Sequence, residues 1–100
     1  MSENRALQTA LEAVNDSESF LAFVRALIAD RIDEIQIEKV NPSPPYGRGA
    51  NGWENGTIEA FLEAAVSWAE VTDFGERQRT TDQNPWHKFA LFLYLGKIYE

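Results

Sequence analysis

The stretch from Asn84 to Tyr99, NPWHKFALFLYLGKIY, constrains the fold more than any other part of the chain. Asn84 suits a helix N-cap, and Pro85 suits the first helical position, where the amide that proline lacks would have no partner in the helix. Apolar residues then fall on almost every side of the predicted helix. Because such a helix is buried on several sides, we expect it to be the central element of the domain.

Two helices are predicted in the N-terminal part of the chain from apolar residues spaced at i, i+3, i+4 and i+7. The first covers about residues 3–14. The second follows an Asp16 or Ser17 cap and is expected to end near residue 36. Residues 35–40 also alternate as a strand would, so helix, strand and loop all stay open there. The predicted apolar face of the second helix comprises Phe20, Phe23, Val24, Leu27 and Ile28, and Ile32 and Ile35 could extend it.

A third helix is predicted to follow a Thr57 N-cap and to end at Asp73, Phe74 and Gly75. A polar connector at 76–83 separates it from the C-terminal helix. The whole chain, 1–100, is therefore predicted to be a single domain, an all-α compact bundle of about four helices with the C-terminal helix central. The expected apolar face of the third helix comprises Ile58, Phe61, Leu62, Ala65, Trp68 and Ala69.

A long loop rich in proline and glycine is predicted between the second and third helices, over about residues 38–56. Its segment GRGANG, 47–52, matches the spelling of a dinucleotide-binding loop, but a proline-rich stretch stands where that site needs a strand. Its segment PSPP, 42–45, spells a P-x-x-P docking motif, a pattern that is common by chance. Both segments are interpreted as loop, and loops of this length are often functional.

Charge and composition limit the partners that the chain can bind. The net charge of −7, from nine bases and sixteen acids, argues against nucleic acid and against anionic membrane surfaces. Residues 57–75 contain four acids and no base, which favours a basic protein if there is a macromolecular partner. The absence of cysteine, of a signal-peptide block and of a membrane-spanning run leads us to expect a cytoplasmic protein. The oligomeric state stays open.

No catalytic, cofactor or metal constellation is recognised in the sequence. His87 is the single histidine and has no cysteine beside it, so we expect a partly exposed or capping residue. Asp30, Asp33 and Glu34 lie on one side of the second helix, and clustered carboxylates suit hard cations. Their spacing is not that of a calcium loop and Arg31 lies between them, so we interpret them as a solvated face. Neither enzyme activity nor a bound cofactor or metal is expected.

The three tryptophans offer an alternative function. Trp53, Trp68 and Trp86 could wall an aromatic pocket between the third and fourth helices that takes a small molecule or peptide. Trp68 shares the apolar face of the third helix, so its expected place is the core. Trp53 lies four residues before the Thr57 cap, and we expect it to fold back over the helix entrance, as in a hydrophobic staple.

The C-terminal half carries aromatic and acidic residues at characteristic spacings. They are Trp53-Glu54-Asn55, Thr57, Phe61-Leu62-Glu63-Ala64, Trp68, Pro85-Trp86, Phe89-Ala90, Leu93 and Tyr99-Glu100. This pattern resembles an uncharacterised family of small bacterial domains, mainly over residues 53–100, and the loop at 38–52 looks like an insertion relative to shorter members. The resemblance implies a bacterial cytoplasmic protein of about this length, and it implies no catalytic residue because the family has no assigned activity. By analogy with small acidic proteins encoded beside toxins, we expect non-enzymatic binding, such as immunity-like inhibition of a basic partner.

Overall fold

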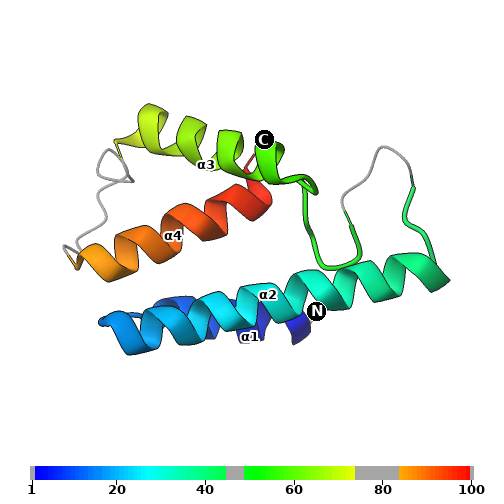
Figure 1. The fold of residues 1–100 in the computed structure, drawn as a ribbon, viewed down its shortest axis with the longest axis horizontal. Helices are drawn as coiled ribbons and strands as arrows, with labels where there is room; N and C mark the ends of the chain where they lie inside the picture. Colours follow the sequence, from blue (N-terminus) through cyan, green and yellow to red (C-terminus); the bar gives the residue numbers. More distant parts are fainter. Residues whose placement is uncertain (1, 45–48, 74–83, 100) are drawn as a thin grey trace.

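Four helices make up the regular structure of the computed structural model, which describes residues 2–44, 49–73 and 84–99 (Figure 1). They are α1 (Ser2–Glu12), α2 (Ser17–Val40), α3 (Ile58–Thr72) and α4 (Pro85–Ile98). No strand occurs in the described ranges, and residues 35–40 are helical. The predicted all-α bundle is confirmed.

The C-terminal helix joins two layers of the molecule. α1 lies against α2 in one layer, and α3 lies against α4 in the other (Figure 1). α4 also contacts α1 and α2, whereas α3 packs against α4 alone among the described helices. The predicted central position of the C-terminal helix is therefore confirmed, and one side of α3 is left without a neighbouring helix.

The helices begin at the residues that the sequence indicates. Asp16 Oδ1 accepts the amide of Ser19 at 2.8 Å, and the Ser19 hydroxyl accepts the amide of Asp16 at 3.1 Å, which forms a capping box at the start of α2. The Ser19 amide, and the Ser19 hydroxyl, which donates to Asp16 Oδ1 at 2.7 Å, hold the pKa of Asp16 below its ordinary value. Thr57 caps α3 and Asn84 caps α4, with Pro85 as the first residue of the last helix.

The end of α2 differs from the prediction. The helix continues to Val40 instead of ending near residue 36, so the loop begins at Asn41 rather than at residue 38. The amide of Asn41 still donates to the Ile37 carbonyl at 2.8 Å. The Glu38 carboxylate accepts the amides of Ser43 and Ala50, at 2.7 and 2.9 Å. These bonds from the loop stabilise the last turn of α2, and local residue preferences do not predict them.

The far end of α3 is only partly covered by the described residues. α3 ends at Thr72, and Asp73 adopts the left-handed conformation, with φ of 55°, that is common just after a helix. The predicted terminators Phe74 and Gly75, and the connector 76–83, lie outside the described residues.

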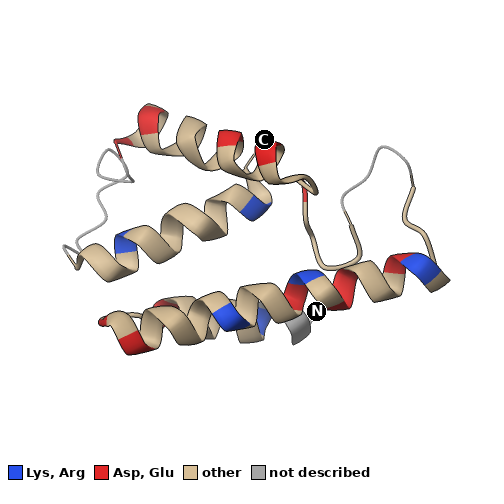
Figure 2. Ribbon diagram, viewed as in Figure 1, with Lys and Arg blue, Asp and Glu red and all other residues tan. Residues whose placement is uncertain are grey.

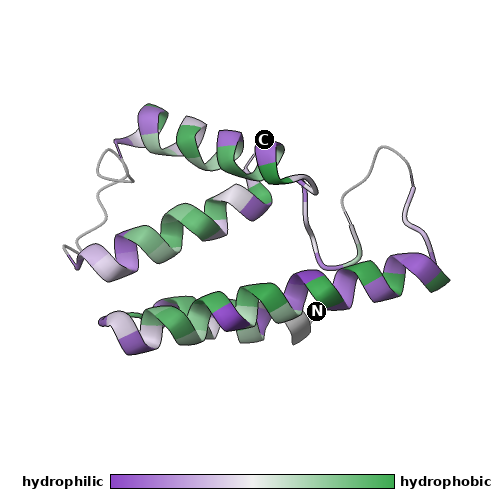
Figure 3. Ribbon diagram, in the orientation of Figure 1, coloured by the Kyte–Doolittle hydropathy of each residue, from purple (hydrophilic) through white to green (hydrophobic). Residues whose placement is uncertain are grey.

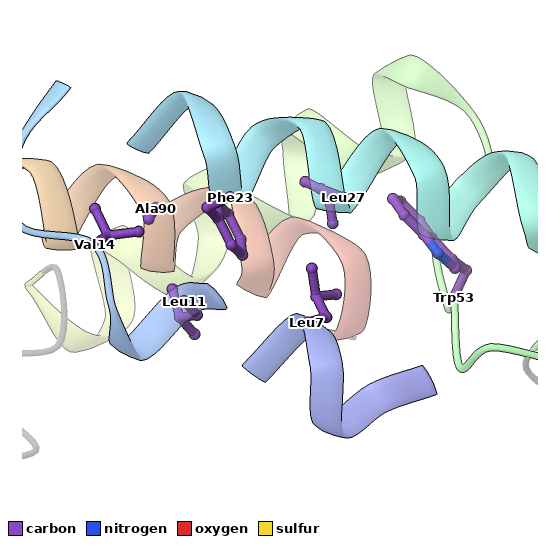
Figure 4. Close-up of a cluster of buried hydrophobic side chains, with 7 residues drawn as sticks. All are labelled: Leu7, Leu11, Val14, Phe23, Leu27, Trp53 and Ala90. Atoms are coloured by element: carbon purple, nitrogen blue, oxygen red, sulfur yellow. The ribbon is translucent and has the colours of Figure 1, made fainter. Parts of the chain in front are cut away.

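The main core fills the space between α1, α2 and α4 (Figure 4). Phe23 and Ala90 are completely buried in it. α3 approaches α4 closely at Gly96, where an added Cβ would lie 2.9 Å from the Phe61 carbonyl oxygen. The buried members of this core are Leu7, Leu11, Val14, Phe23, Leu27, Trp53 and Ala90.

The predicted apolar faces of α2 and α3 are wrong in part. Ile28, Ile32 and Ile35 of α2 are 54%, 52% and 41% exposed, and Ile58 and Leu62 of α3 are 78% and 47% exposed. Among the described helices, α2 buries a narrower face against α1 and α4, and α3 meets α4 alone, so none of these helices covers the apolar edges. Among the described helices, none combines the length and the apolarity that crossing a membrane requires.

Candidate functional site

A buried ion pair joins the two layers of the bundle. The Lys97 ammonium nitrogen of α4 lies 2.7 Å from Asp30 Oδ2 of α2, and both side chains are almost fully buried. The indole nitrogen of Trp53 donates to the same carboxylate oxygen at 2.8 Å. Burial of a charged pair is costly unless its remaining polar atoms are bonded. Here the carboxylate has two donors, so this arrangement fixes the position of the Trp53 ring.

One turn further along α2, Glu34 binds the backbone of the loop. Its Oε1 accepts the amides of Asn51 and Trp53 at 2.9 and 3.3 Å, and its Oε2 pairs with Arg31 at 2.8 Å. Asn51 is itself buried and donates its side-chain amide to the carbonyl of Asp30 at 3.0 Å. We call Asp30, Arg31, Glu34, Asn51, Trp53 and Lys97 the polar cluster.

The interpretation of the α2 acids as a solvated face is wrong for two of the three. Asp30 and Glu34 are only 8% and 3% exposed, whereas Asp33 is exposed and accepts the Asn51 side-chain amide. Their carboxylates are occupied by protein donors, and no group of acids and histidine in the described part of the chain is arranged to hold a metal ion. The hydrogen bonds of the polar cluster hold the loop against α2.

The sequence carries a signal for the polar cluster. Phe23, Leu27, Asp30 and Glu34 are spaced at i, i+4, i+7 and i+11, so the two acids continue the buried face of α2. Lys97 is the matching signal, since it stands in an otherwise apolar end of α4. A base inside one core face and acids inside another indicate a buried pair.

Within the polar cluster, Trp53 is the residue that contacts the start of α3. Its ring stacks on Phe61 with the centroids 5.9 Å apart, and Phe61 is the fourth residue of α3. The cationic groups of Arg31 and Lys97 lie 5.4 and 5.6 Å from the ring centroid, within the range of cation–π attraction. The expectation that Trp53 folds back over the entrance of the third helix is confirmed.

An open apolar groove of about 430 Å³ lies between α2 and the beginning of α3. Its size falls in the range of ligand-binding sites. Trp53 and Phe61 line it, and Arg31 crosses it, because its second guanidinium nitrogen donates to the Gly56 carbonyl at 3.1 Å. We call this space the groove. It is lined by Leu27, Ile28, Arg31, Ile32, Trp53, Asn55, Gly56, Thr57, Ile58, Phe61 and Leu62.

Exposed apolar side chains lie beyond the groove along both helices. Figure 3 shows hydrophobic positions, in green, along the lengths of α2 and α3. On α2, Leu21 and Ile35 precede and follow Ile28 by seven residues and are 49% and 41% exposed. On α3, Val66 follows Leu62 by one turn, and a second hollow lies over these two side chains. Apolar side chains that stay exposed side by side along two helices commonly mark a binding surface.

Figure 2 shows acidic positions alone on α3 and positions of both signs on α2. α3 presents exposed Glu59, Glu63 and Glu70 and contains no base. On α2, exposed Arg25 and Lys39 lie one turn beyond Leu21 and Ile35 respectively. The groove therefore has an acidic edge on α3 and basic groups along α2.

The other candidate residues lie away from the groove. Trp68 is 3% exposed, as expected of a core residue. Trp86 is 37% exposed, and its ring centroid lies 5.5 Å from that of Phe20. Trp86 precedes Lys97 by eleven residues, which places it about 16 Å along α4 from the polar cluster. Of the three tryptophans, Trp53 alone lines the groove.

His87 is likewise at the other end of α4 from the buried acids. It is half-buried in the first turn, ten residues and about 15 Å before Lys97. Its backbone amide donates to the Asn84 side chain at 3.4 Å, so the capping residue of this turn is Asn84. The histidine is not brought together with Asp30 or Glu34.

The proline- and glycine-rich motifs belong to the loop that the polar cluster holds. Gly47, Arg48 and Pro45 lie outside the described residues. Gly49 packs so closely on the Glu34 carboxyl that an added Cβ would overlap it. Gly52 has φ of 86°, a conformation that glycine adopts without strain. These described glycines serve the close approach of loop and helix.

Comparison with known proteins gives one family match. A model of a family of unknown function, DUF7660, matches residues 16–100, which include α2, α3, α4, the polar cluster and the groove. α1 precedes the matched segment. No curated protein and no solved structure matches the chain. Over residues 16–100 the chain belongs to DUF7660, a family of unknown function.

Proposed function

We propose that the protein is a non-enzymatic binding protein and that the groove between α2 and α3 is its binding surface. The observation that carries this proposal is the exposed apolar lining of a groove whose floor is held in place. Ile28, Ile32 and Ile58 are more than half exposed, whereas the adjoining Trp53 is 8% exposed. Binding there covers the apolar edges without rearranging the floor, and a preorganised surface binds at a lower entropic cost.

A protein partner is supported by the length of the exposed apolar surface. The stripe on α2 runs from Leu21 to Ile35, which is about 21 Å at the helical rise. A stripe of this length is longer than the surface that a small ligand in the groove would cover. Interfaces between proteins combine such apolar centres with a charged rim.

The charge of the chain supports a basic partner. The net charge is −7, and the acidic residues of α3 border the groove. Complementary charge raises the rate of encounter and selects against acidic competitors. An immunity-like inhibitor of a basic protein, in a bacterial cytoplasm, is the specific form of this proposal. The absence of cysteine suits that reducing compartment.

A small molecule in the groove is the second candidate. The volume of about 430 Å³ and the aromatic floor of Trp53 and Phe61 favour it. This candidate differs from the aromatic pocket expected between the third and fourth helices, because Trp68 and Trp86 do not line the groove. Native mass spectrometry of protein purified from its source cells distinguishes a retained small ligand from a protein partner.

Photo-cross-linking in the source cell tests the proposed function. A benzophenone amino acid placed at Ile32 or Ile58 should cross-link to the same protein, and Leu62→Glu should abolish both products. The matched control position is Glu12, which is exposed on α1. Equal cross-linking from Glu12, or none from the groove, contradicts a binding surface at this place.

A further inference from the structure

We infer that the groove accepts one amphipathic helix of a partner protein, with a basic flank against α3 and an acidic flank against α2. This inference rests on the proposed function and names the partner's chemistry. A helix that lays its apolar face into a groove is a recurrent mode of recognition and uses anchors at i, i+3 or i+4, and i+7. α2 and α3, the helices on the two sides of the groove, carry exposed apolar side chains at comparable spacings.

The dimensions of the walls fit a helix of about four turns. Leu21, Ile28 and Ile35 repeat every seven residues along α2 and cover about 21 Å. Ile58, Leu62 and Val66 repeat every four residues along α3 and cover about 12 Å. A partner helix of about 14 residues matches the length of the α2 stripe, and within the groove it meets Ile28 from α2 and Ile58 and Leu62 from α3.

The floor between the walls is set by contacts that leave the apolar surface free. Arg31 is held by Glu34 and the Gly56 carbonyl, and it lies over the Trp53 ring. Its charge therefore has partners within the protein. Phe61 and the small part of the Trp53 ring that stays exposed line the floor below the incoming helix.

Charges on the walls fix which flank of the partner helix faces which wall. Glu59 precedes Leu62 by three residues and Glu63 precedes Val66 by three, so both carboxylates lie beside the apolar stripe of α3. On α2, Arg25 and Lys39 stand beside Ile28 and Ile35, and Glu18 stands beside Leu21, so bases outnumber acids along this stripe. Lysine or arginine toward α3, and glutamate or aspartate toward α2, complement this pattern.

The overall charge favours a separate partner over a second copy of the chain. Two copies with a net charge of −7 each repel one another on approach, whereas a basic partner is attracted. An anionic membrane surface is repelled for the same reason. The occupant to which these observations point is a helix from a basic protein.

Three synthetic 16-residue peptides test the inference by NMR titration of the isotope-labelled protein. The first has leucine and isoleucine at heptad a and d positions, lysines on one flank and glutamates on the other. The second carries glutamates on both flanks, and the third is the first peptide in scrambled order. The first should shift the amides of Ile32, Ile58 and Leu62, and the second should bind about tenfold more weakly.

Charge reversal on α3 tests the orientation. The double variant Glu59→Lys/Glu63→Lys should weaken binding of the first peptide about tenfold and strengthen binding of the second. Ile32→Glu should abolish binding of the first peptide. Val71→Glu is the matched control, since Val71 is 60% exposed but does not line the groove, and it should bind as the unmodified protein does.

Specific results overturn the inference. Equal binding of the first and scrambled peptides, or unchanged binding by Ile32→Glu, excludes a helix in the groove. Sedimentation that shows a dimer dissociated by Ile32→Glu identifies a second copy as the occupant. If the peptides fail while the photo-cross-links from Ile32 and Ile58 persist, the proposed function stands and the helical partner is wrong.

Discussion

Lys97 and Asp30 are 67 residues apart in the sequence, yet their charged atoms lie 2.7 Å apart in the interior of the bundle. This pair connects α4, the central helix, to the face of α2 that also holds the loop. Trp53 shares the Asp30 oxygen, so one carboxylate determines the positions of a helix and of the groove floor together. Asp30 therefore shapes the groove, although its own side chain is buried.

The first prediction is that Lys97→Met destabilises the fold by about 3–5 kcal/mol, because it leaves the Asp30 carboxylate buried without its cation. Urea denaturation followed by circular dichroism measures the change. The double variant Asp30→Asn/Lys97→Met removes both charges and keeps an acceptor for the Trp53 indole. It should be more stable than Lys97→Met alone, and a larger loss in the double variant would contradict the pairing.

The second prediction compares two glycines of the loop. Gly49→Ala should destabilise the protein by about 1–3 kcal/mol, since the added Cβ overlaps the Glu34 carboxyl that binds the loop amides. At Gly56 the added Cβ would lie 3.4 Å from the nearest Arg31 nitrogen, so Gly56→Ala should change stability by less than about 1 kcal/mol. Thermal unfolding of the two variants measures the difference, and equal losses would argue against the close contact at Gly49.

The fold was largely predictable because its signals are local. Asp16, Thr57 and Asn84 cap helices through bonds to residues two or three positions ahead, and such bonds are visible in a short stretch of sequence. The apolar circumference of the C-terminal helix likewise indicated its central place. The end of α2 was misplaced because Glu38 is bonded to Ala50, twelve residues away.

The candidate site was less predictable because it reverses the usual distribution of residue types. Ile28, Ile32 and Ile35 have helical spacing typical of a core face, yet they are exposed. Asp30 and Glu34 resemble a solvated surface, yet they are buried by partners from the loop and from α4. Periodicity gives the positions around a helix, but it does not say which of those positions another helix covers.

The third prediction concerns pH. Hydrogen bonds from the Ser43 side chain and backbone, and from the Ala50 amide, hold the pKa of Glu38 below its ordinary value of 4.5. A carboxyl with a lowered pKa in the folded state stabilises the fold above its unfolded pKa and loses that contribution as pH falls through the folded pKa. The protection factors of the Ser43 and Ala50 amides, which are their exchange rates corrected for the intrinsic pH dependence of exchange, should therefore fall below about pH 4.5.

The control for this pH dependence is Glu38→Gln. The glutamine side chain does not ionise in this range, so the amides of Ser43 and Ala50 should exchange faster than in the unmodified protein near neutral pH. They should also lack the acid-dependent step. If Glu38→Gln retains the full step below pH 4.5, another group controls the attachment of the loop to α2.

The fourth prediction separates a core tryptophan from a surface one. Trp68 is 3% exposed, so Trp68→Ala should cost about 3–5 kcal/mol through lost burial and the cavity left behind. Trp86 is 37% exposed and its ring contacts Phe20, so Trp86→Ala should cost only about 1–2 kcal/mol. Urea unfolding monitored at a far-ultraviolet helix band measures both changes without relying on tryptophan emission. A loss below about 1 kcal/mol at Trp68 would place its ring at the surface, where it would be free to bind a ligand.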